Sequence, residues 1–367
     1  MKHAMRALLF LSAFFTAVLS PAYGQQVSAA LPDPFTRPQT PHPPFPYRDI
    51  EVAFRNPADP EVSLAGTLTL PNSTEPFLAV LLVTGAGPQD RNQELYGHRP
   101  FQVLADDLTR RGVAVLRVDD RGVGASTGSA DGATLRAIAT DVAAGFAFLK
   151  SRDDIDDDRI GLVGHSLGGM IVSRFAATEA DVAFVVSLSR PVVTGVEFMA
   201  EQTRQAVLAA GGTDEQADAR ASLQRDLMGV IKAHPHDDKT ARENLLAFFS
   251  ARQRPTPSDE TLSSLLSPDV LDLVRYDPVA TLAGLDIPVL AVFGGQDRQI
   301  PRLLDYSTLA AGLRQNAGSM IVILPGLNHF LQTAETGLPD EYGAIPETLS
   351  PRALNLIGEW IIAQMGD

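Results

Sequence analysis

Short, continuously apolar segments alternate along the chain with segments whose apolar residues recur at helical spacing, and this alternation constrains the fold most. Residues 78–85 and 112–119 are apolar nearly throughout, which is typical of strands buried on both faces of a sheet. Between them, Phe101, Leu104 and Leu108 would share one face of a helix. Similar apolar segments follow at 159–164, 182–189, 287–295 and 319–326. The pattern predicts an α/β fold with a mostly parallel central sheet and helices on both of its faces.

Segments before, within and after this pattern predict further elements. Residues 49–56 and 61–71 alternate apolar with polar side chains, so they are expected to form an antiparallel pair at the start of the sheet. A helix is expected over residues 132–151, with Asp131 as its N-terminal cap. Two further helices are expected over 167–178 and 351–365.

The interval between the apolar segments at 182–189 and 287–295 does not fit this rhythm. A crossover between parallel strands needs only about a dozen residues, but this interval is much longer and carries several apolar stripes at helical spacing. Residues 192–275 are therefore predicted to be an inserted helical cap. The core of the fold would then comprise residues 49–191 and 276–367.

The N-terminus has the features of an export signal. A basic start precedes an apolar run at residues 7–19, and small side chains precede Gln25. The run is shorter than the roughly 20 residues that span a bilayer, so no stable membrane insertion of the mature chain is expected. Residues 1–24 are predicted to be a signal peptide cleaved near Gly24, which would make the protein periplasmic or secreted.

A proline-rich segment, residues 25–48, separates this signal from the predicted sheet. Seven prolines lie in its part 32–46. Proline fixes φ and has no N–H to donate to a neighbouring strand. The segment is therefore predicted to be an extended strap or linker on the surface.

Charge and cysteine content exclude several classes of function. The formal net charge is −14, whereas nucleic acid is held by clustered Lys and Arg, so no nucleic-acid partner is expected. The chain has no cysteine. This excludes disulfides, thiolate metal sites and a cysteine nucleophile.

The segment GLVGHSLGGM, residues 161–170, contains a G-x-S-x-G pattern centred on Ser166. Five residues of this kind occur by chance, but here they lie between a predicted buried strand and a predicted helix. That setting is the one in which a sharp turn presents a serine as a nucleophile. Ser166 is therefore the candidate nucleophile, the alternative being a serine that caps the following helix.

A serine hydroxyl needs a base, and seven histidines are available. His329 is favoured because it follows the last predicted strand, in a loop from which it can reach back over the sheet. His98 is a weaker candidate. His165 is adjacent to Ser166 in sequence, so its side chain is expected to point elsewhere. The others lie in the N-terminal segments or in the predicted insertion: His3, His42, His234 and His236.

The third member of such a site is a carboxylate that orients the imidazole. Asp297 follows the predicted strand 287–295, and the chain order Ser166, Asp297, His329 is the one expected for this arrangement. Asp305 is the alternative, although it is expected to fall inside the next helix. The alternative role for Asp297 is to cap that helix.

Two backbone N–H groups should bind the oxyanion that forms on the attacked carbonyl. One is assigned to Leu167, directly after the nucleophile. The other is assigned to Ala86, with Gly87 as second choice, in the loop after the first buried strand. The neighbouring residues Gln89, Asp90 and Arg91 are expected to be a structural polar cluster that makes this loop rigid.

Two other segments resemble ligand-binding motifs but fail as such. Residues 119–128 follow a strand as a dinucleotide-binding loop does, but Thr127 stands where the third glycine is needed. The acidic residues 153–158 lack the glycine and the distal glutamate of a calcium loop, so a solvated turn is expected. Neither a cofactor nor a metal is implied.

With these residues in place, the chain resembles the α/β-hydrolase superfamily over roughly residues 50–367. Several segments are similar to its bacterial esterase and acyl-hydrolase branch, near the dienelactone-hydrolase-like and serine-aminopeptidase-like groups. They are VTGAGPQDRN, LADDLTRRGVAVLRVDDRGVGAST, RIGLVGHSLGG, VFGGQDRQIP and LPGLNHFL. The resemblance implies the α/β-hydrolase fold, a carboxylesterase-type activity and a helical cap after the sixth core strand. The loop after the first buried strand departs from the family's commoner His-Gly, because it begins Thr84-Gly85.

The residues and the resemblance together predict an exported serine hydrolase that cleaves small carboxylic esters through an acyl-enzyme intermediate. Three alternatives stay open: a thioesterase or acyltransferase, a serine peptidase on short peptides, and a non-enzymatic binding protein on a hydrolase fold. The sequence does not indicate an oligomeric state.

Overall fold

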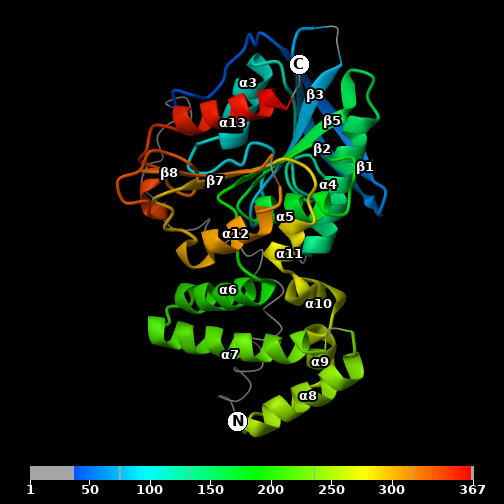
Figure 1. Ribbon diagram of the computed structural model, residues 1–367, viewed down its shortest axis with the longest axis vertical. Coiled ribbons are helices and arrows are strands. Elements are labelled where there is room, and N and C mark those ends of the chain that lie inside the picture. Colours follow the sequence, from blue (N-terminus) through cyan, green and yellow to red (C-terminus); the bar gives the residue numbers. More distant parts are fainter. Residues whose placement is uncertain (1–36, 74–75, 132, 235, 317, 365–367) are drawn as a thin grey trace. The chain divides into compact units, whose positions relative to one another are not determined.

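The computed structural model describes residues 37–73, 76–131, 133–234, 236–316 and 318–364 (Figure 1). The described residues form two compact units. One comprises Val192–Pro278, and the other comprises the residues before and after that segment. The predicted signal peptide lies outside the described residues.

An eight-stranded sheet forms the centre of the larger unit, in the order β1-β2-β4-β3-β5-β6-β7-β8. The first two strands, β1 (Arg48–Asn56) and β2 (Asp59–Leu70), are antiparallel, and β2 pairs antiparallel with β4 (Ala114–Val118). All later pairings are parallel. The other strands are β3 (Phe77–Val83), β5 (Ile155–His165), β6 (Val185–Leu188), β7 (Val289–Gly294) and β8 (Met320–Leu324). The predicted fold class, a mostly parallel sheet in an α/β protein, is confirmed.

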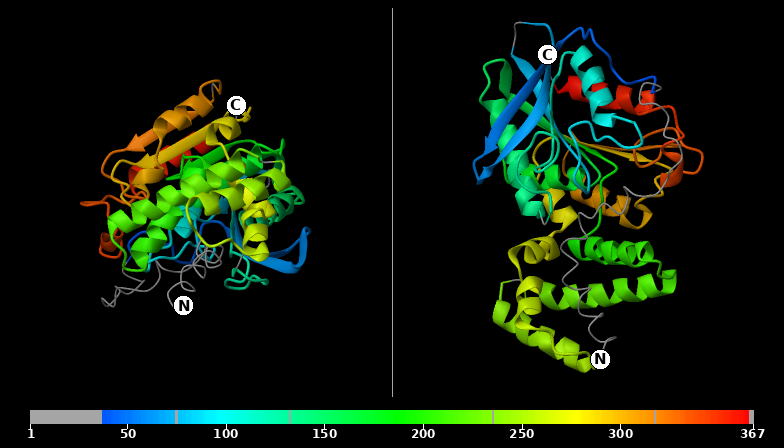
Figure 2. Two further views of the ribbon diagram at one scale, coloured as in Figure 1. Left: turned by 90° about the horizontal axis from the view of Figure 1, so that it is seen from below. Right: turned by 180° about the vertical axis from the view of Figure 1, so that it is seen from behind.

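Helices cover both faces of this sheet. On one face α3 (Pro100–Arg110) and α13 (Pro351–Ala363) lie side by side, as the cyan and red helices of Figures 1 and 2 show. Their buried apolar residues share one cluster with those of the central strands. On the other face α4 (Leu135–Lys150) and α5 (Leu167–Ala176) contact each other and the sheet. Burial on both sides explains why the central strands are apolar throughout.

Three local expectations were wrong. Residues 153–158 were expected to form a solvated turn, but most of them belong to a strand, because β5 begins at Ile155. Helix α4 begins four residues after Asp131, and its cap is Thr134, whose hydroxyl accepts the Ala137 N–H at 3.2 Å. Thr134 has the extended backbone of a cap and directly precedes the apolar run of the helix. Asp305 does not lie inside a helix, because it caps α12 (Tyr306–Leu313).

The insertion, Val192–Pro278, is helical and has a hydrophobic core of its own. Its helices are α6 (Gly195–Ala209), α7 (Asp214–Lys232), α8 (Asp238–Ala251), α9 (Asp259–Leu265) and α10 (Pro268–Arg275), and α11 (Pro278–Ala283) follows. Buried residues from α7, α8, α9 and α10 form one apolar cluster. Among the residues that the structure describes in both units, no helix is both long enough and apolar enough to cross a bilayer.

The described part of the proline-rich segment is bound to the larger unit through Arg37. The guanidinium of this buried residue donates hydrogen bonds to the carbonyl groups of Ile345, Tyr96 and Gly343, at 2.6, 2.7 and 2.8 Å. A single side chain therefore satisfies acceptors in two loops that are far apart in sequence.

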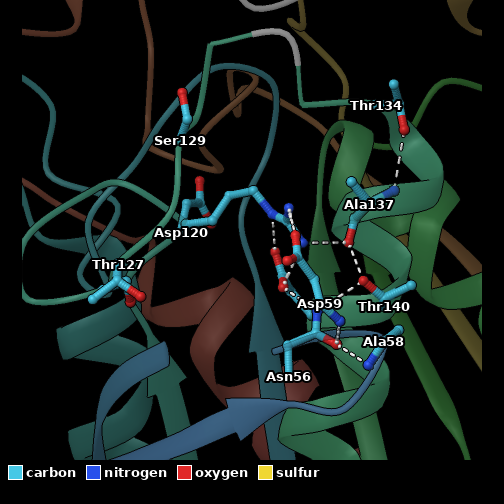
Figure 3. A network of polar contacts seen from close by, with 12 residues as sticks. Asn56, Ala58, Asp59, Asp120, Thr127, Ser129, Thr134, Ala137 and Thr140 are labelled. Carbon is cyan, nitrogen blue, oxygen red and sulfur yellow. Dashed lines mark hydrogen bonds and ion pairs between the residues drawn. The ribbon is translucent and has the colours of Figure 1, made fainter. Parts of the chain in front are cut away.

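A second buried guanidinium, that of Arg121, anchors the loop after β4. Figure 3 shows the polar network around it, with Asn56, Asp59 and Ala137 among the labelled residues. It donates to both carboxylate oxygens of Asp141 on α4, at 2.7 and 2.9 Å, and to Asp59 at 3.0 Å. It also donates to the carbonyl of Ala137, and the Asn56 side chain adds a hydrogen bond to Asp141 at 2.7 Å. The loop after β4 is thereby attached to the first strand pair and to α4.

Candidate functional site

The candidate residues all lie in loops at the carboxyl ends of parallel strands. Ser166 directly follows β5, Asp297 and His329 follow β7 and β8, and the loop with Ala86 follows β3. These strands are parallel neighbours in one sheet, so their carboxyl ends meet at one edge. Ligands of open α/β sheets bind outside that edge.

Ser166 occupies a strained turn between β5 and α5. Its φ of 53° and ψ of −122° lie outside the regions that non-glycine residues usually occupy. Its side chain makes no capping hydrogen bond to α5 and remains partly exposed. The alternative interpretation of Ser166 as a capping serine is therefore wrong.

Two glycines allow this turn to pack closely. A Cβ on Gly164 would lie 2.4 Å from the backbone of Gly168, and a Cβ on Gly168 would lie 2.3 Å from the carbonyl oxygen of Thr84. Real Cβ atoms do not approach other atoms so closely, so any larger residue would push the turn away from β3.

The loop after β3 lies directly beside the nucleophile turn. A Cβ on Gly85 would lie only 3.2 Å from the Cβ of Ser166. The Gln89 side chain donates a hydrogen bond to the Ala86 carbonyl at 2.9 Å, which orients the Ala86–Gly87 peptide group. The N–H of Leu167, the first residue of α5, has no acceptor within its own helix. The predicted N–H donors thus come from segments that contact each other.

Polar contacts hold this loop as the sequence predicted for Gln89, Asp90 and Arg91. Arg91 donates to both oxygens of Asp119, at 3.0 and 2.8 Å, and Asp90 accepts the Glu94 N–H at 2.8 Å. These residues act as supports of the loop.

Asp297 and His329 form a buried, hydrogen-bonded pair. Their side chains are fully buried, and His329 Nδ1 lies 2.7 Å from Asp297 Oδ2. Burial raises the pKa of the Asp297 carboxyl, but the charge and hydrogen bond of His329, with the Ile300 and Gln299 N–H groups, outweigh it and lower that pKa below its usual value. An ionised Asp297 accepts a hydrogen bond from His329 Nδ1–H, which leaves Nε2 of the imidazole without a proton as the basic nitrogen.

His329 Nε2 is the atom that such a site needs. It is buried and has no hydrogen-bond partner among the residues that the structure describes. A buried nitrogen without a partner is costly in free energy, and a catalytic role is one explanation for such an atom. Asp305, the alternative carboxylate, instead accepts the N–H groups of Ser307 and Thr308 at 3.1 Å as a helix cap.

His165 links the nucleophile turn to the His329 loop. Its Nε2–H donates to the His329 carbonyl at 3.0 Å, and its Nδ1 therefore accepts from the Gln93 amide at 2.8 Å. Burial, followed by the charge of His329, lowers the pKa of His165 to about 3. Its ring also packs on that of His329, with centroids 4.9 Å apart. With both nitrogens engaged, His165 supports the base and does not replace it.

Two other histidines, His98 and His234, have polar partners. His98 is buried, with its nitrogens 2.9 Å from Thr348 Oγ1 and 3.0 Å from the Tyr342 carbonyl, and burial lowers its pKa to about 4. His234 and His236 belong to the insertion, and His234 contacts Asn244.

Sequence reasoning missed the residues that position the site. Asn328 accepts the N–H groups of Phe330 and Gln332 at 3.0 Å, which shapes the turn that carries His329. Gln93 completes the contacts of His165, as described above. Their only signal in the sequence is proximity to the candidate loops, because their partners lie far away along the chain.

Comparisons with known proteins agree with this architecture. A model of the alpha/beta hydrolase family matches residues 80–338. The esterase EstD of Thermotoga maritima is 26% identical over 304 residues, which cover 82% of this chain and 65% of EstD. An uncharacterized 31.7 kDa protein of Escherichia coli is 28% identical over 223 residues, covering 58% of this chain and 73% of that protein.

Among solved structures, Est1E from Butyrivibrio proteoclasticus with bound ferulic acid has a similar fold. It superposes with a TM-score of 0.52 at 18% identity, over 86% of this chain and 100% of Est1E. At this identity the similarity concerns the fold alone. The match to the family model extends from β3 to the loop after His329 and thus includes every candidate residue. The chain therefore belongs to the alpha/beta hydrolase family.

Proposed function

We propose that the protein is a serine hydrolase that cleaves carboxylic esters. One observation carries the proposal: the buried hydrogen bond between Asp297 and His329, which leaves His329 Nε2 without a partner among the described residues. A nucleophile turn with Ser166 at positive φ and the adjoining loop after β3 supply the other parts of an acyl-transfer site.

In the proposed mechanism Ser166 Oγ attacks the ester carbonyl while His329 Nε2 takes its proton. Asp297 holds the imidazole in the tautomer that exposes Nε2 and stabilises the imidazolium that forms. The N–H groups of Leu167 and Ala86 bind the oxyanion, with Gly87 as the second choice for the latter. His329 then protonates the departing alcohol, which leaves an acyl group on Ser166. A water molecule, deprotonated by His329, releases the carboxylic acid and restores the enzyme.

We propose esters rather than amides as substrates because of the names and the ligand of the similar proteins. EstD is named an esterase, and Est1E binds ferulic acid. The aligned part of this chain covers only 65% of EstD, so the substrate preference remains part of the proposal. We also propose that the helical insertion is a cap that sets the substrate, and that the protein is exported through residues 1–24.

Export predicts that the mature chain recovered from the periplasm or the medium begins near Gln25. N-terminal sequencing of that chain measures its first residue. Recovery of an uncleaved chain from the cytoplasm would contradict export.

Substitution Ser166→Ala should abolish covalent labelling by a fluorophosphonate probe and reduce kcat for ester hydrolysis by about 10⁶-fold. The reason is that no other hydroxyl is presented to the base in the same turn. Ser129→Ala, at an exposed serine of the same unit, is the matched control and should retain full labelling. Labelling of the Ser166→Ala protein at the wild-type rate would show that the nucleophile lies elsewhere.

Substitution Asp297→Asn should reduce kcat by about 10³- to 10⁴-fold, because an amide favours the wrong tautomer of His329. Asp305→Asn is the matched control, since Asp305 caps α12 and asparagine is about as good an N-cap as aspartate, so little stability should be lost. Steady-state kinetics and urea unfolding of both proteins provide the comparison. Equal losses of kcat in the two variants would contradict the assignment of Asp297.

A substrate series separates the remaining alternatives. We expect kcat/KM for p-nitrophenyl esters to exceed the values for acyl thioesters and for aminoacyl p-nitroanilides. The comparison uses one enzyme preparation with acyl chains of increasing length. Faster cleavage of the anilides would identify a peptidase, and faster cleavage or transfer from the thioesters would identify a thioesterase or acyltransferase.

A further inference from the structure

The loop after β4 contains a carboxylate that the proposed mechanism does not use. Asp120 belongs to the segment 119–128, which resembles a dinucleotide-binding loop only superficially. Its neighbours on both sides have structural partners: Asp119 accepts from Arg91, and Arg121 donates to Asp141. The partners of Asp120 lie instead in the loop beside Ser166.

Asp120 holds that loop at two points. Its carboxylate accepts a hydrogen bond from the Thr84 hydroxyl, at 2.9 Å for Oδ1 and 3.1 Å for Oδ2. Oδ2 also accepts the Gln89 N–H at 2.9 Å, and the Asp120 N–H donates to the Gln89 carbonyl at 3.1 Å. One residue of the β4 loop therefore fixes both the beginning and the end of the segment from Thr84 to Gln89.

The held segment is the one that contains the proposed oxyanion donor. Gln89, itself fixed by Asp120, donates its side-chain amide to the Ala86 carbonyl at 2.9 Å. At the other end of the segment, the Thr84 carbonyl oxygen contacts the backbone of Gly168. Any rotation of this segment would move the Ala86 and Gly87 N–H groups relative to Ser166.

We propose that Asp120 is a positioning residue that holds the loop from Thr84 to Gln89 in the geometry that binds the oxyanion. The proposal rests on the proposed function, because it assigns no chemistry of its own to Asp120. It explains why threonine can begin a loop that more commonly begins with histidine in this family, since the Thr84 hydroxyl supplies the donor that Asp120 requires.

The charge state of Asp120 gives the proposal a distinctive signature. Burial raises the pKa of the Asp120 carboxyl to about 7, against the hydrogen bonds from Gln89 N–H and Thr84, and the charges of Asp141 and Asp119 raise it further. The cations closest to those two aspartates, Arg91 and Arg121, are paired with them. Asp120 therefore changes between a carboxylate that accepts both hydrogen bonds and a neutral acid near neutral pH.

The sign of the stability effect follows from that shift. The folded-state pKa lies above the unfolded value of about 3.9, so the folded state binds the proton more tightly. Stability is therefore lost as the pH rises from about 4 through about 7. The folded protein is therefore less stable when Asp120 is ionised, although the ionised form is the one that holds the loop. A residue with a merely structural role would instead stabilise the fold in the form that makes its contacts.

The test compares Asp120→Asn, Thr84→Val and the double variant with wild type. We expect each single variant to reduce kcat for a p-nitrophenyl ester by about 10- to 100-fold with little change in KM, because the loss affects only the transition state. The double variant should lose little more than Asp120→Asn alone, since Thr84→Val removes one of the two contacts that the Asp120 carboxylate makes with the loop. Additive losses, or a change in KM alone, would overturn the proposal.

Stability and pH profile provide the independent readouts. The midpoint of thermal unfolding of Asp120→Asn at pH 8 should equal or exceed that of wild type, whereas a structural role would lower it together with kcat. In wild type, log(kcat/KM) should fall with a slope steeper than one as the pH drops below about 7, and Asp120→Asn should restore a slope of one. An unchanged slope would overturn the role of the carboxylate.

A matched control and a labelling measurement distinguish this proposal from the proposed function. Asp107→Asn removes a carboxylate that pairs with Arg111 outside the β4 loop and its contacts, and it should lower the unfolding midpoint while kcat is retained. Failure of wild type to react with a fluorophosphonate would reject the proposed function itself. Full labelling and hydrolysis by wild type, with unchanged kcat in Asp120→Asn and Thr84→Val, would reject only the positioning role.

Discussion

The close contact of two backbones determines the geometry of the whole site. Gly168, in the first turn of α5, packs directly against the carbonyl oxygens of Val83 and Thr84 at the end of β3. This contact fixes the distance between the nucleophile turn and the loop that should bind the oxyanion. Because both segments continue strands of one hydrogen-bonded sheet, the rigidity of the core is transmitted to the reacting groups without any intervening side chain.

Around this contact, the other loops are attached by buried polar groups. His165 connects the turn to the backbone of His329, and Asp120 connects the β3 loop to the β4 loop. Each of these residues has its partners in a neighbouring loop at the same edge of the sheet. Such cross-connections keep several independent loops in one arrangement, which is what a site assembled from the ends of four strands requires.

The sequence was sufficient for the fold class, since the central strands are buried on both faces and are therefore apolar throughout. It also located Asp297 and His329 well enough to predict that they belong together, because chain order and position after a strand are properties of the sequence. It placed Asp131 wrongly as the cap of α4, since Thr134 is an equally suitable cap closer to the apolar run. The roles of Asp120 and His165 depend on contacts between distant segments, and no local pattern encodes such contacts.

The helical insertion has a consequence for how this protein can vary. Its buried apolar cluster is built from its own helices α7 to α10, whereas the candidate site is held together by contacts inside the sheet unit. The apolar cluster and the candidate site belong to different units. The effects of substitutions in the cluster and in the site on stability are therefore expected to be nearly independent. On the proposed role of the insertion as a cap, exchange of this segment between relatives would change selectivity by recombination without any alteration of the reaction chemistry.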